Sequence, residues 1–273
     1  MPKKNYFEPD YQKLNRCAKR GRANNKEKQP EKFLQKIMPW SSEKPAFIYE
    51  PKLLQELSTK ISEIKRRIDW GQNIAGSSYV VFDTETTGLR PYSGDEITSI
   101  GAVIIENKTI LDKPNFYQLV KPGRAIPLQA QRITGLTNEM VRQKQPIIPV
   151  LKDFLDFCGP RILIAHNAPF DLAFINNKIG EAIGRRIVNP VIDTVLLTSA
   201  LYYSIGDYSL ENLSKIFNFP LDGRHNALGD SYIAAMLYLK LLPELQQKGI
   251  TTLHDLAGFF AEQDLTRGYP LIF

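Results

Sequence analysis

The chain is poor in cysteine and histidine, and it has no long hydrophobic run. Its 273 residues include two cysteines, Cys17 and Cys158, and three histidines. Two distant cysteines exclude a disulfide framework and the paired spacing of a structural zinc site, which favours a reducing, cytoplasmic setting. No apolar stretch approaches the roughly 20 residues that span a bilayer, and the N-terminus lacks the apolar core of a signal peptide. We therefore expect a cytoplasmic protein with no membrane partner.

Positive charge is concentrated in the first part of the chain. Residues 1–76 carry 17 Lys and Arg against 9 Asp and Glu, a balance of +8, whereas residues 77–273 carry 18 against 20, a balance of −2. This asymmetry indicates a polyanionic partner, most simply nucleic acid, although a solvated tail that only aids solubility would have the same composition. We expect a basic N-terminal extension at 1–76, a folded domain at 77–242, and a C-terminal helix and tail at 243–273.

Hydrophobic periodicity predicts an α/β fold. Short runs of β-forming residues predict strands at 79–84, 97–105 and 109–120, which short connections join into an antiparallel meander. A tight turn is expected at Asn107-Lys108. Strand–helix units follow, which predicts a mixed sheet flanked by helices. The remaining strands are expected at 161–165 and 191–192, and the helices at 51–68, 127–133, 138–143, 149–158, 170–179, 193–203, 210–217 (capped by Ser209) and 227–242.

Two acids stand at the end of the first predicted strand, in the stretch from Tyr79 to Leu89. Residues i and i+2 of a strand point to the same face, so Asp83 and Glu85 project together. Two carboxylates side by side are costly unless a cation neutralises them, and Mg²⁺ and Mn²⁺ prefer such oxygen ligands. Taken alone, the pair could equally lie at a strand end and face water.

Three further acids stand beside small or polar residues. Asp171 and Asp193 each open a predicted helix after a strand, where α/β sheets place their functional sites. Either could instead be a helix N-terminal charge that favours the helix dipole. Asp230 lies close to the apolar face of the helix predicted at 227–242 and requires a partner there.

Three segments resemble the exonuclease motifs of the DEDDh 3′–5′ exonucleases, a family with a ribonuclease H-like fold. They are Asp83-Thr84-Glu85-Thr86-Thr87-Gly88-Leu89, His166-Asn167-Ala168-Pro169-Phe170-Asp171 and His225-Asn226-Ala227-Leu228-Gly229-Asp230. Two shorter segments resemble further parts of the family, Ile133-Thr134-Gly135-Leu136-Thr137 and Asp193-Thr194. The resemblance covers about 60% of the chain, residues 77–242. It is greatest to the proofreading epsilon subunit of bacterial DNA polymerase III and its exonuclease relatives.

The resemblance implies a metal site made of four carboxylates. Asp83, Glu85 and Asp230 would hold one ion, Asp83 would bridge to a second, and Asp171 would support that one. Four converging carboxylates suit two Mg²⁺ or Mn²⁺ ions roughly 3.5–4 Å apart, which clamp the attacking and leaving oxygens of a phosphodiester. The expected fold is therefore the ribonuclease H-like sheet, with the exonuclease domain at 77–242.

The general base is expected to be a histidine, because its side chain titrates near neutrality. His166 and His225 both stand five residues before an acid, so spacing does not choose between them; the resemblance assigns the base to His225. His166 and Asn167 are expected to line the substrate groove. The resemblance further implies contacts to the 3′-terminal nucleotide from four other residues, Thr86, Gly88, Leu89 and Phe170.

The expected activity is hydrolysis of nucleic-acid 3′ ends to nucleoside 5′-monophosphates. Single-stranded DNA is favoured, because oligoribonuclease-like members usually have methionine where Thr86 stands. An exoribonuclease of the same family is the alternative. Two non-catalytic hypotheses are a binding module that has lost its chemistry, which would lack an acid or the base, and a polymerase-bound subunit that docks on a protein partner through residues 1–76. None of the expected acids or the base is missing.

Overall fold

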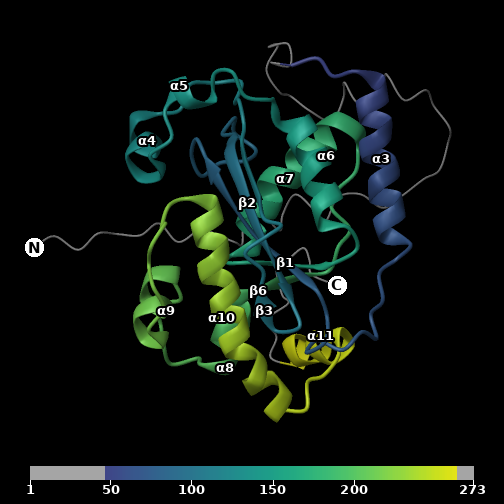
Figure 1. Cartoon of the computed structure of the whole chain (residues 1–273), viewed down its shortest axis with the longest axis vertical. Helices are drawn as coiled ribbons and strands as arrows, with labels where there is room; N and C mark the ends of the chain where they lie inside the picture. The colour runs from purple at the N-terminus through teal and green to yellow at the C-terminus, as the bar shows by residue number, and fades with distance from the viewer. Residues whose placement is uncertain (1–46, 263–273) are drawn as a thin grey trace, which may run out of the picture. The chain divides into compact units, whose positions relative to one another are not determined.

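A six-stranded mixed sheet lies at the centre of the computed structural model, which describes residues 47–262 (Figure 1). The strands are β1 (Tyr79–Thr86), β2 (Ile97–Glu106), β3 (Thr109–Ile110), β4 (Phe116–Leu119), β5 (Ile162–Ala165) and β6 (Val191–Asp193). Their order is β3-β2-β1-β5-β6, and β4 also pairs with β2. β1 is antiparallel to β2 and parallel to β5, and β5 is parallel to β6. The predicted mixed sheet and meander are confirmed.

Helices cover both faces of this sheet (Figure 1). They are α3 (Pro51–Lys65), α4 (Leu128–Thr134), α5 (Asn138–Val141), α6 (Ile147–Cys158), α7 (Ala168–Ile183), α8 (Thr194–Leu201), α9 (Leu210–Phe217), α10 (Ala227–Gln247) and α11 (Leu253–Glu262). One hydrophobic cluster joins the sheet to α3, α6 and α7, and a second joins its other face to α8, α9, α10 and α11. Among the described residues, no helix has both the length and the apolar character needed to cross a bilayer.

Alternation along β1 decides which helices its residues meet. Val80 and Phe82 belong to the cluster with α6 and α7, whereas Tyr79 and Val81 belong to the cluster with α10. The side-chain period of a strand is two, so Asp83 and Glu85 continue the face toward α10. Thr84 continues the opposite face, toward α7.

The third predicted strand, at 109–120, was wrong as a single element. The chain forms β3 and β4, both paired with β2, with a break between them around the cis Lys113–Pro114 peptide bond. Proline has no N–H to donate to a ladder, which accounts for the interruption. The predicted turn is confirmed, since Asn107 and Lys108 have φ angles of 50° and 60°, as hairpin turns of this length require.

The predicted amphipathic helix is confirmed over Pro51–Lys65. Leu57, Ile61 and Ile64 are buried, and the helix packs against α6 and α7. Helix α10 continues past its predicted end at Leu242, through Pro243 to Gln247. The basic stretch at 1–46 and the apolar tail at 263–273 lie outside the described residues.

Candidate active site

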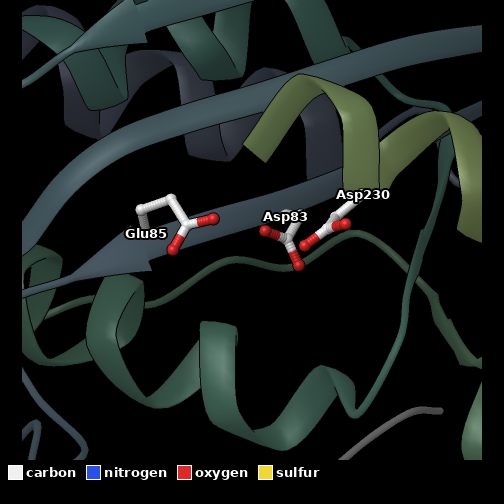
Figure 2. A group of neighbouring side chains, drawn as sticks. All are labelled: Asp83, Glu85 and Asp230. Carbon is white, nitrogen blue, oxygen red and sulfur yellow. The ribbon is translucent and has the colours of Figure 1, made fainter. Parts of the chain in front are cut away.

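Three carboxylates converge between β1 and α10. Asp83 and Glu85 extend from β1 and Asp230 from the first turn of α10, and oxygens of the three side chains lie within 4.8 Å of one another (Figure 2). Asp83 and Glu85 are partly exposed, whereas Asp230 is only 5% exposed. The strand register shifts between Glu85 and Thr86, and such bulges re-aim side chains next to active sites.

A glycine allows α10 to approach β2 closely enough to complete this cluster. Gly101 is the cross-strand partner of Asp83. A Cβ atom at Gly101 would lie 2.2 Å from the backbone of Ala227, so a larger residue would push the helix away. The Ser231 hydroxyl donates to the Gly101 carbonyl at 3.0 Å and fixes the contact. The position of Asp230 opposite β1 therefore depends on Gly101.

Asp171 approaches from α7 and is held by Thr84. Its Oδ1 accepts hydrogen bonds from the Thr84 backbone N–H at 2.9 Å and from the Thr84 hydroxyl at 2.6 Å. Thr84 lies between Asp83 and Glu85 on the opposite face of β1, so Asp171 reaches the acid cluster from the other side of the strand. Asp171 therefore lies close enough to act on Asp83 through its charge, but it is not one of the three acids whose oxygens lie within 4.8 Å of one another.

Burial and mutual repulsion shift the titration of these acids. Burial, followed by the charges of Asp171, Asp230 and Glu85, raises the pKa of Asp83 well above its ordinary range. Burial and then Asp230 raise the pKa of Glu85 to about 8. Burial raises the pKa of Asp171 to about 7, although the hydrogen bonds from Thr84 oppose the shift. The carboxylates therefore repel one another unless positive charge is supplied.

The loop before α10 carries Arg224 and His225 to the cluster. A Cβ atom at Gly229 would lie 2.2 Å from the Gly223 carbonyl oxygen, so glycine lets this loop fold back onto the helix. Arg224 pairs with Oδ2 of Asp230 at 2.5 Å, and the His225 N–H donates to the same oxygen at 3.3 Å. His225 has a φ of 61° and an exposed side chain, so its imidazole is accessible to solvent.

The second predicted histidine has different surroundings. His166 Nδ1 lies 2.9 Å from the Thr194 hydroxyl. Burial and then the charge of Arg224 lower the pKa of His166 to about 3, so its ring is neutral at physiological pH. Next to it, the Asn167 N–H donates to Asp193 at 3.0 Å. Asp193 is fully buried and caps α8 by accepting from Val195 at 2.9 Å.

The residues expected to hold the terminal nucleotide stand near the acids in the sequence, after Glu85 and before Asp171. The Thr86 hydroxyl donates to the Gly88 carbonyl at 2.6 Å, and a Cβ atom at Gly88 would lie 2.4 Å from the Asp95 carboxylate. Leu89 is 76% exposed, so its side chain is free to contact a ligand. Phe170 is partly buried and packs on Phe174, with ring centroids 5.1 Å apart.

The donor set fits a divalent cation. The cluster consists of carboxylates, and hard ions such as Mg²⁺ and Mn²⁺ prefer oxygen ligands. Asp230 lies beside Asp83 (Figure 2), and its Oδ1 is buried and accepts no hydrogen bond from the described residues. A buried carboxylate oxygen without a donor requires a partner, and an ion at the cluster would supply one.

Two residues of this arrangement were not singled out from the sequence. Thr84 positions Asp171, and Arg224 neutralises part of the charge on Asp230. The available signals were that Thr84 stands between two acids and that Arg224 directly precedes His225. Neither signal identifies a partner, because both contacts depend on how β1, α7 and α10 meet in space.

Comparisons with known proteins agree on one family. An exonuclease family model, RNase_T, matches residues 80–238. A DNA polymerase III subunit epsilon-like protein of Rhodobacter capsulatus is 43% identical over 177 residues, which are 64% of this chain and 25% of that protein. A PolC-type DNA polymerase III of Bacillus subtilis is 37% identical over 176 residues, 63% of this chain and 12% of the polymerase. The matched part therefore spans a quarter or less of these relatives.

Solved structures give the same fold. Exonuclease X, in a complex with 5′-overhanging duplex DNA, is 28% identical with a TM-score of 0.52, covering 66% of this chain and 98% of that one. The nuclease domain of 3′hExo, a DEDDh family member bound to rAMP, has a TM-score of 0.55 at 19% identity, covering 63% of this chain and 95% of that domain. The sheet, the acidic cluster and the matches together show that the chain belongs to the exonuclease family of ribonuclease H-like fold.

Proposed function

We propose that the protein is a metal-dependent 3′–5′ exonuclease that releases nucleoside 5′-monophosphates from DNA 3′ ends. The observation that carries the proposal is the meeting of Asp83, Glu85 and Asp230 within 4.8 Å. Three carboxylates this close are arranged for cation binding, because burial and then their mutual repulsion raise the pKa values of Asp83 and Glu85. The catalytic unit is proposed to span residues 77–242.

Each site residue has a proposed role. Asp83, Glu85 and Asp230 hold one Mg²⁺ or Mn²⁺ ion, and Asp83 with Asp171 holds a second. Such ions supply positive charge at the scissile phosphate and acidify bound water. His225 takes the proton from the attacking water, for which its exposed side chain is suitable.

The proposed substrate contacts come from the residues that stand near the acids in the sequence. Leu89 and Phe170 pack against the terminal nucleotide, since apolar and aromatic side chains contact bases without reading their identity. Thr86 and Gly88 shape the loop that places Leu89. His166, neutral and bonded to Thr194, keeps the following Asn167 in position beside the substrate.

DNA is the proposed substrate because of the relatives and of Thr86. The relatives are named as DNA polymerase III proteins, and the 28%-identical neighbour was solved with duplex DNA. Those properties belong to those proteins, and their extension to this chain is part of the proposal. RNA remains the alternative substrate and is included in the test.

The test is a degradation assay with 5′-labelled single-stranded DNA, duplex DNA and RNA, in Mg²⁺, Mn²⁺ or EDTA. Cleavage from the 3′ end is expected to give a ladder of progressively shorter labelled strands, fastest on single-stranded DNA and absent in EDTA. Asp83→Asn, purified in the same way, controls for a contaminating nuclease. Immediate release of the labelled nucleotide would show the opposite polarity, and activity in EDTA would contradict the metal-dependent mechanism.

The basic segment at 1–46 is proposed to add non-specific affinity for the substrate. It carries 12 Lys and Arg against 5 Asp and Glu. The logarithm of the affinity falls linearly with the logarithm of the salt concentration, and each phosphate contact adds about −0.7 to that slope on single strands. Removing residues 1–46 leaves the buried face of α3 in place, so it is expected to flatten the salt slope without changing turnover at saturating substrate. An unchanged slope would favour docking of this segment on a protein partner, such as a polymerase.

A further inference from the structure

Tyr117 lies in line with the acidic cluster, two strands across the sheet from Asp83. Its cross-strand partner on β2 is Gly101, and the cross-strand partner of Gly101 on β1 is Asp83. Residues directly opposite one another share a face of the sheet, so Tyr117 projects toward α10, as Asp83 does. Two strand spacings separate their backbones by roughly 10 Å. Tyr117 therefore stands near the cluster without being one of its members.

The hydroxyl of Tyr117 reaches the loop before α10. Its neighbour Phe116 is 7% exposed and packs against Phe154 in the core, with ring centroids 5.7 Å apart. Tyr117 itself is 38% exposed, so its ring does not fill the core. Its hydroxyl oxygen accepts a hydrogen bond from the side-chain amide of Asn226 at 3.0 Å. This contact joins β4 to the loop that carries His225.

Both ends of the Asn226 side chain are held. Its Oδ1 caps α10 by accepting from the N–H groups of Leu228 at 3.0 Å and Gly229 at 3.4 Å, as asparagine does at helix N-caps. Its Nδ2 donates to Tyr117. Because the two N–H donors of the helix require the oxygen end, the nitrogen end is left to face Tyr117. The orientation of the amide is therefore set by α10 on one side and by β4 on the other.

Asn226 follows a residue whose backbone conformation is rare. His225 has a φ of 61°, in the left-handed region, which costs free energy for a residue other than glycine and persists only where the surroundings impose it. The Asn226 N–H donates to the Gly223 carbonyl at 3.1 Å, and the His225 N–H donates to Oδ2 of Asp230 at 3.3 Å. The backbone is thus held on both sides of His225, which fixes the direction in which its side chain leaves the chain.

The two anchors of this loop differ in whether a metal ion competes for them. Arg224 and the His225 N–H both contact Oδ2 of Asp230. Asp230 is a proposed metal ligand, so an ion draws on the same carboxylate. The hydrogen bond from Asn226 to Tyr117 uses no acid of the cluster. It therefore remains available to the loop when an ion is bound.

We propose that Tyr117 is a positioning residue for the general base. Its hydroxyl holds the Asn226 amide, and Asn226 holds the turn that directs His225 toward the attacking water. Tyr117 itself contacts neither the water nor the proposed ions. The inference rests on the proposed function, because a base has to be positioned only if His225 acts as one.

The experiment compares the kinetics of Tyr117→Phe and the wild type, as full chains, on 5′-labelled single-stranded DNA with Mg²⁺. The substitution removes one hydroxyl and keeps the ring. Turnover at saturating substrate is expected to fall roughly 2- to 10-fold, which corresponds to the loss of one neutral hydrogen bond. The Michaelis constant is expected to stay unchanged, because the contact serves the chemical step and not substrate binding.

Two further variants test the path and the specificity of this effect. Asn226→Ser keeps an oxygen that caps the helix, but its side chain is too short to reach Tyr117, so it is expected to lose turnover by a similar factor. Tyr203→Phe is the matched control, because it removes a hydroxyl from a ring that is 88% exposed and lies outside the proposed site. Its turnover should equal that of the wild type.

A double-mutant cycle separates action through His225 from a general effect on the fold. Tyr117→Phe is introduced into His225→Ala and measured with enzyme in excess over substrate. No further loss is expected, because the residue that Tyr117 positions is already gone. Unfolding temperatures are measured for every variant, and the kinetics are run well below the lowest of them, so that lost turnover does not reflect unfolded protein.

The possible outcomes distinguish this inference from the proposed function. An equal further loss in the His225→Ala background, or a raised Michaelis constant with unchanged turnover, would overturn the role of Tyr117. Wild-type turnover of Tyr117→Phe, on DNA that the wild type cleaves, would overturn that role alone. A wild-type chain that leaves DNA and RNA intact would overturn the proposed function and this inference with it.

Discussion

Two sets of acids lie at the same end of the sheet and differ in the groups that surround them. Asp193 accepts hydrogen bonds from the backbone N–H groups of Asn167 and Val195. Asp230 lies beside other carboxylates; its Oδ2 accepts from Arg224 and His225, and its Oδ1, like Oδ2 of Asp193, accepts no hydrogen bond from the described residues. Asp193 therefore faces backbone donors of the fold, whereas Asp83, Glu85 and Asp230 face one another, and a cation would relieve their repulsion.

The difference between these acids lies in the groups that face them. Backbone donors favour the charged form of a carboxylate and consume its acceptor capacity. Neighbouring carboxylates disfavour the charged form and leave acceptor capacity unused. Asp171 is intermediate, since it accepts two hydrogen bonds from Thr84 and also adds to the repulsion on Asp83.

The largest effect is expected for Asp83→Asn. Asp83 is the acid next to all the others and the one proposed to contact both ions, so turnover should fall by at least about 10³-fold even at saturating Mg²⁺. Removing one of the mutually repelling charges should raise the unfolding temperature in EDTA by about 2–4 °C per kcal/mol of relief. Measurable turnover near the wild-type level would contradict the assignment.

The two histidines provide a second test of this comparison, because one lies beside Asp230 and the other lies near Asp193. His225 adjoins Asp230, and His166 contacts Thr194 next to Asp193. His225→Ala should lower turnover 10²- to 10⁴-fold, the usual range for loss of a general base, with substrate affinity retained. His166→Ala should raise the Michaelis constant more than it lowers turnover. The reverse order at saturating substrate would mean that His166 is the base.

Asp193→Ala tests the structural side of the comparison. The substitution leaves two N–H groups, those of Asn167 and Val195, without their acceptor. An unsatisfied buried donor costs about 1–3 kcal/mol, so the unfolding temperature should drop by several degrees or more. Asp193→Asn keeps one oxygen acceptor and should lose less. Equal unfolding temperatures for wild type and Asp193→Ala would show that these hydrogen bonds add nothing to stability.

Local patterns in the sequence were sufficient to predict most helices and strands and the acids at their ends. Alternation in β1 placed Asp83 and Glu85 on one face, and the helix predicted at 227–242 carried Asp230 on its first turn. The break between β3 and β4 was not predicted, because β-forming residues stand on both sides of Pro114. The end of α10 was not predicted either, because the helix does not stop before Pro243 but continues through it.

Contacts between distant elements could not be obtained in this way. Thr84 and Asp171 are 87 positions apart, and their hydrogen bonds exist only because α7 packs on β1. The hydrogen bonds from Arg185 to Ser58 and Ser62 likewise join residues 127 and 123 positions apart, and they need α3 beside the end of α7. Pairwise packing of this kind depends on the folded arrangement and leaves no local signal.

The smallest expected effect is a pH dependence of stability in the metal-free protein. The pKa of Glu85 is raised to about 8 and that of Asp171 to about 7 in the folded state, above their ordinary values near 4. The folded protein therefore binds protons more tightly than the unfolded chain, and stability is lost as pH rises from about 4 through these raised values. In EDTA, the unfolding temperature of the wild type should fall between pH 5 and pH 8, and Glu85→Gln should reduce that fall by a few degrees.

Asp255→Asn is the matched control, because hydrogen bonds from Thr251 and Thr252 lower the pKa of Asp255 to about 2 and keep it charged throughout this range. It should shift the unfolding temperature equally at both pH values. A Glu85→Gln curve parallel to that of the wild type would mean that burial and the charge of Asp230 do not raise the pKa of Glu85 in the folded protein.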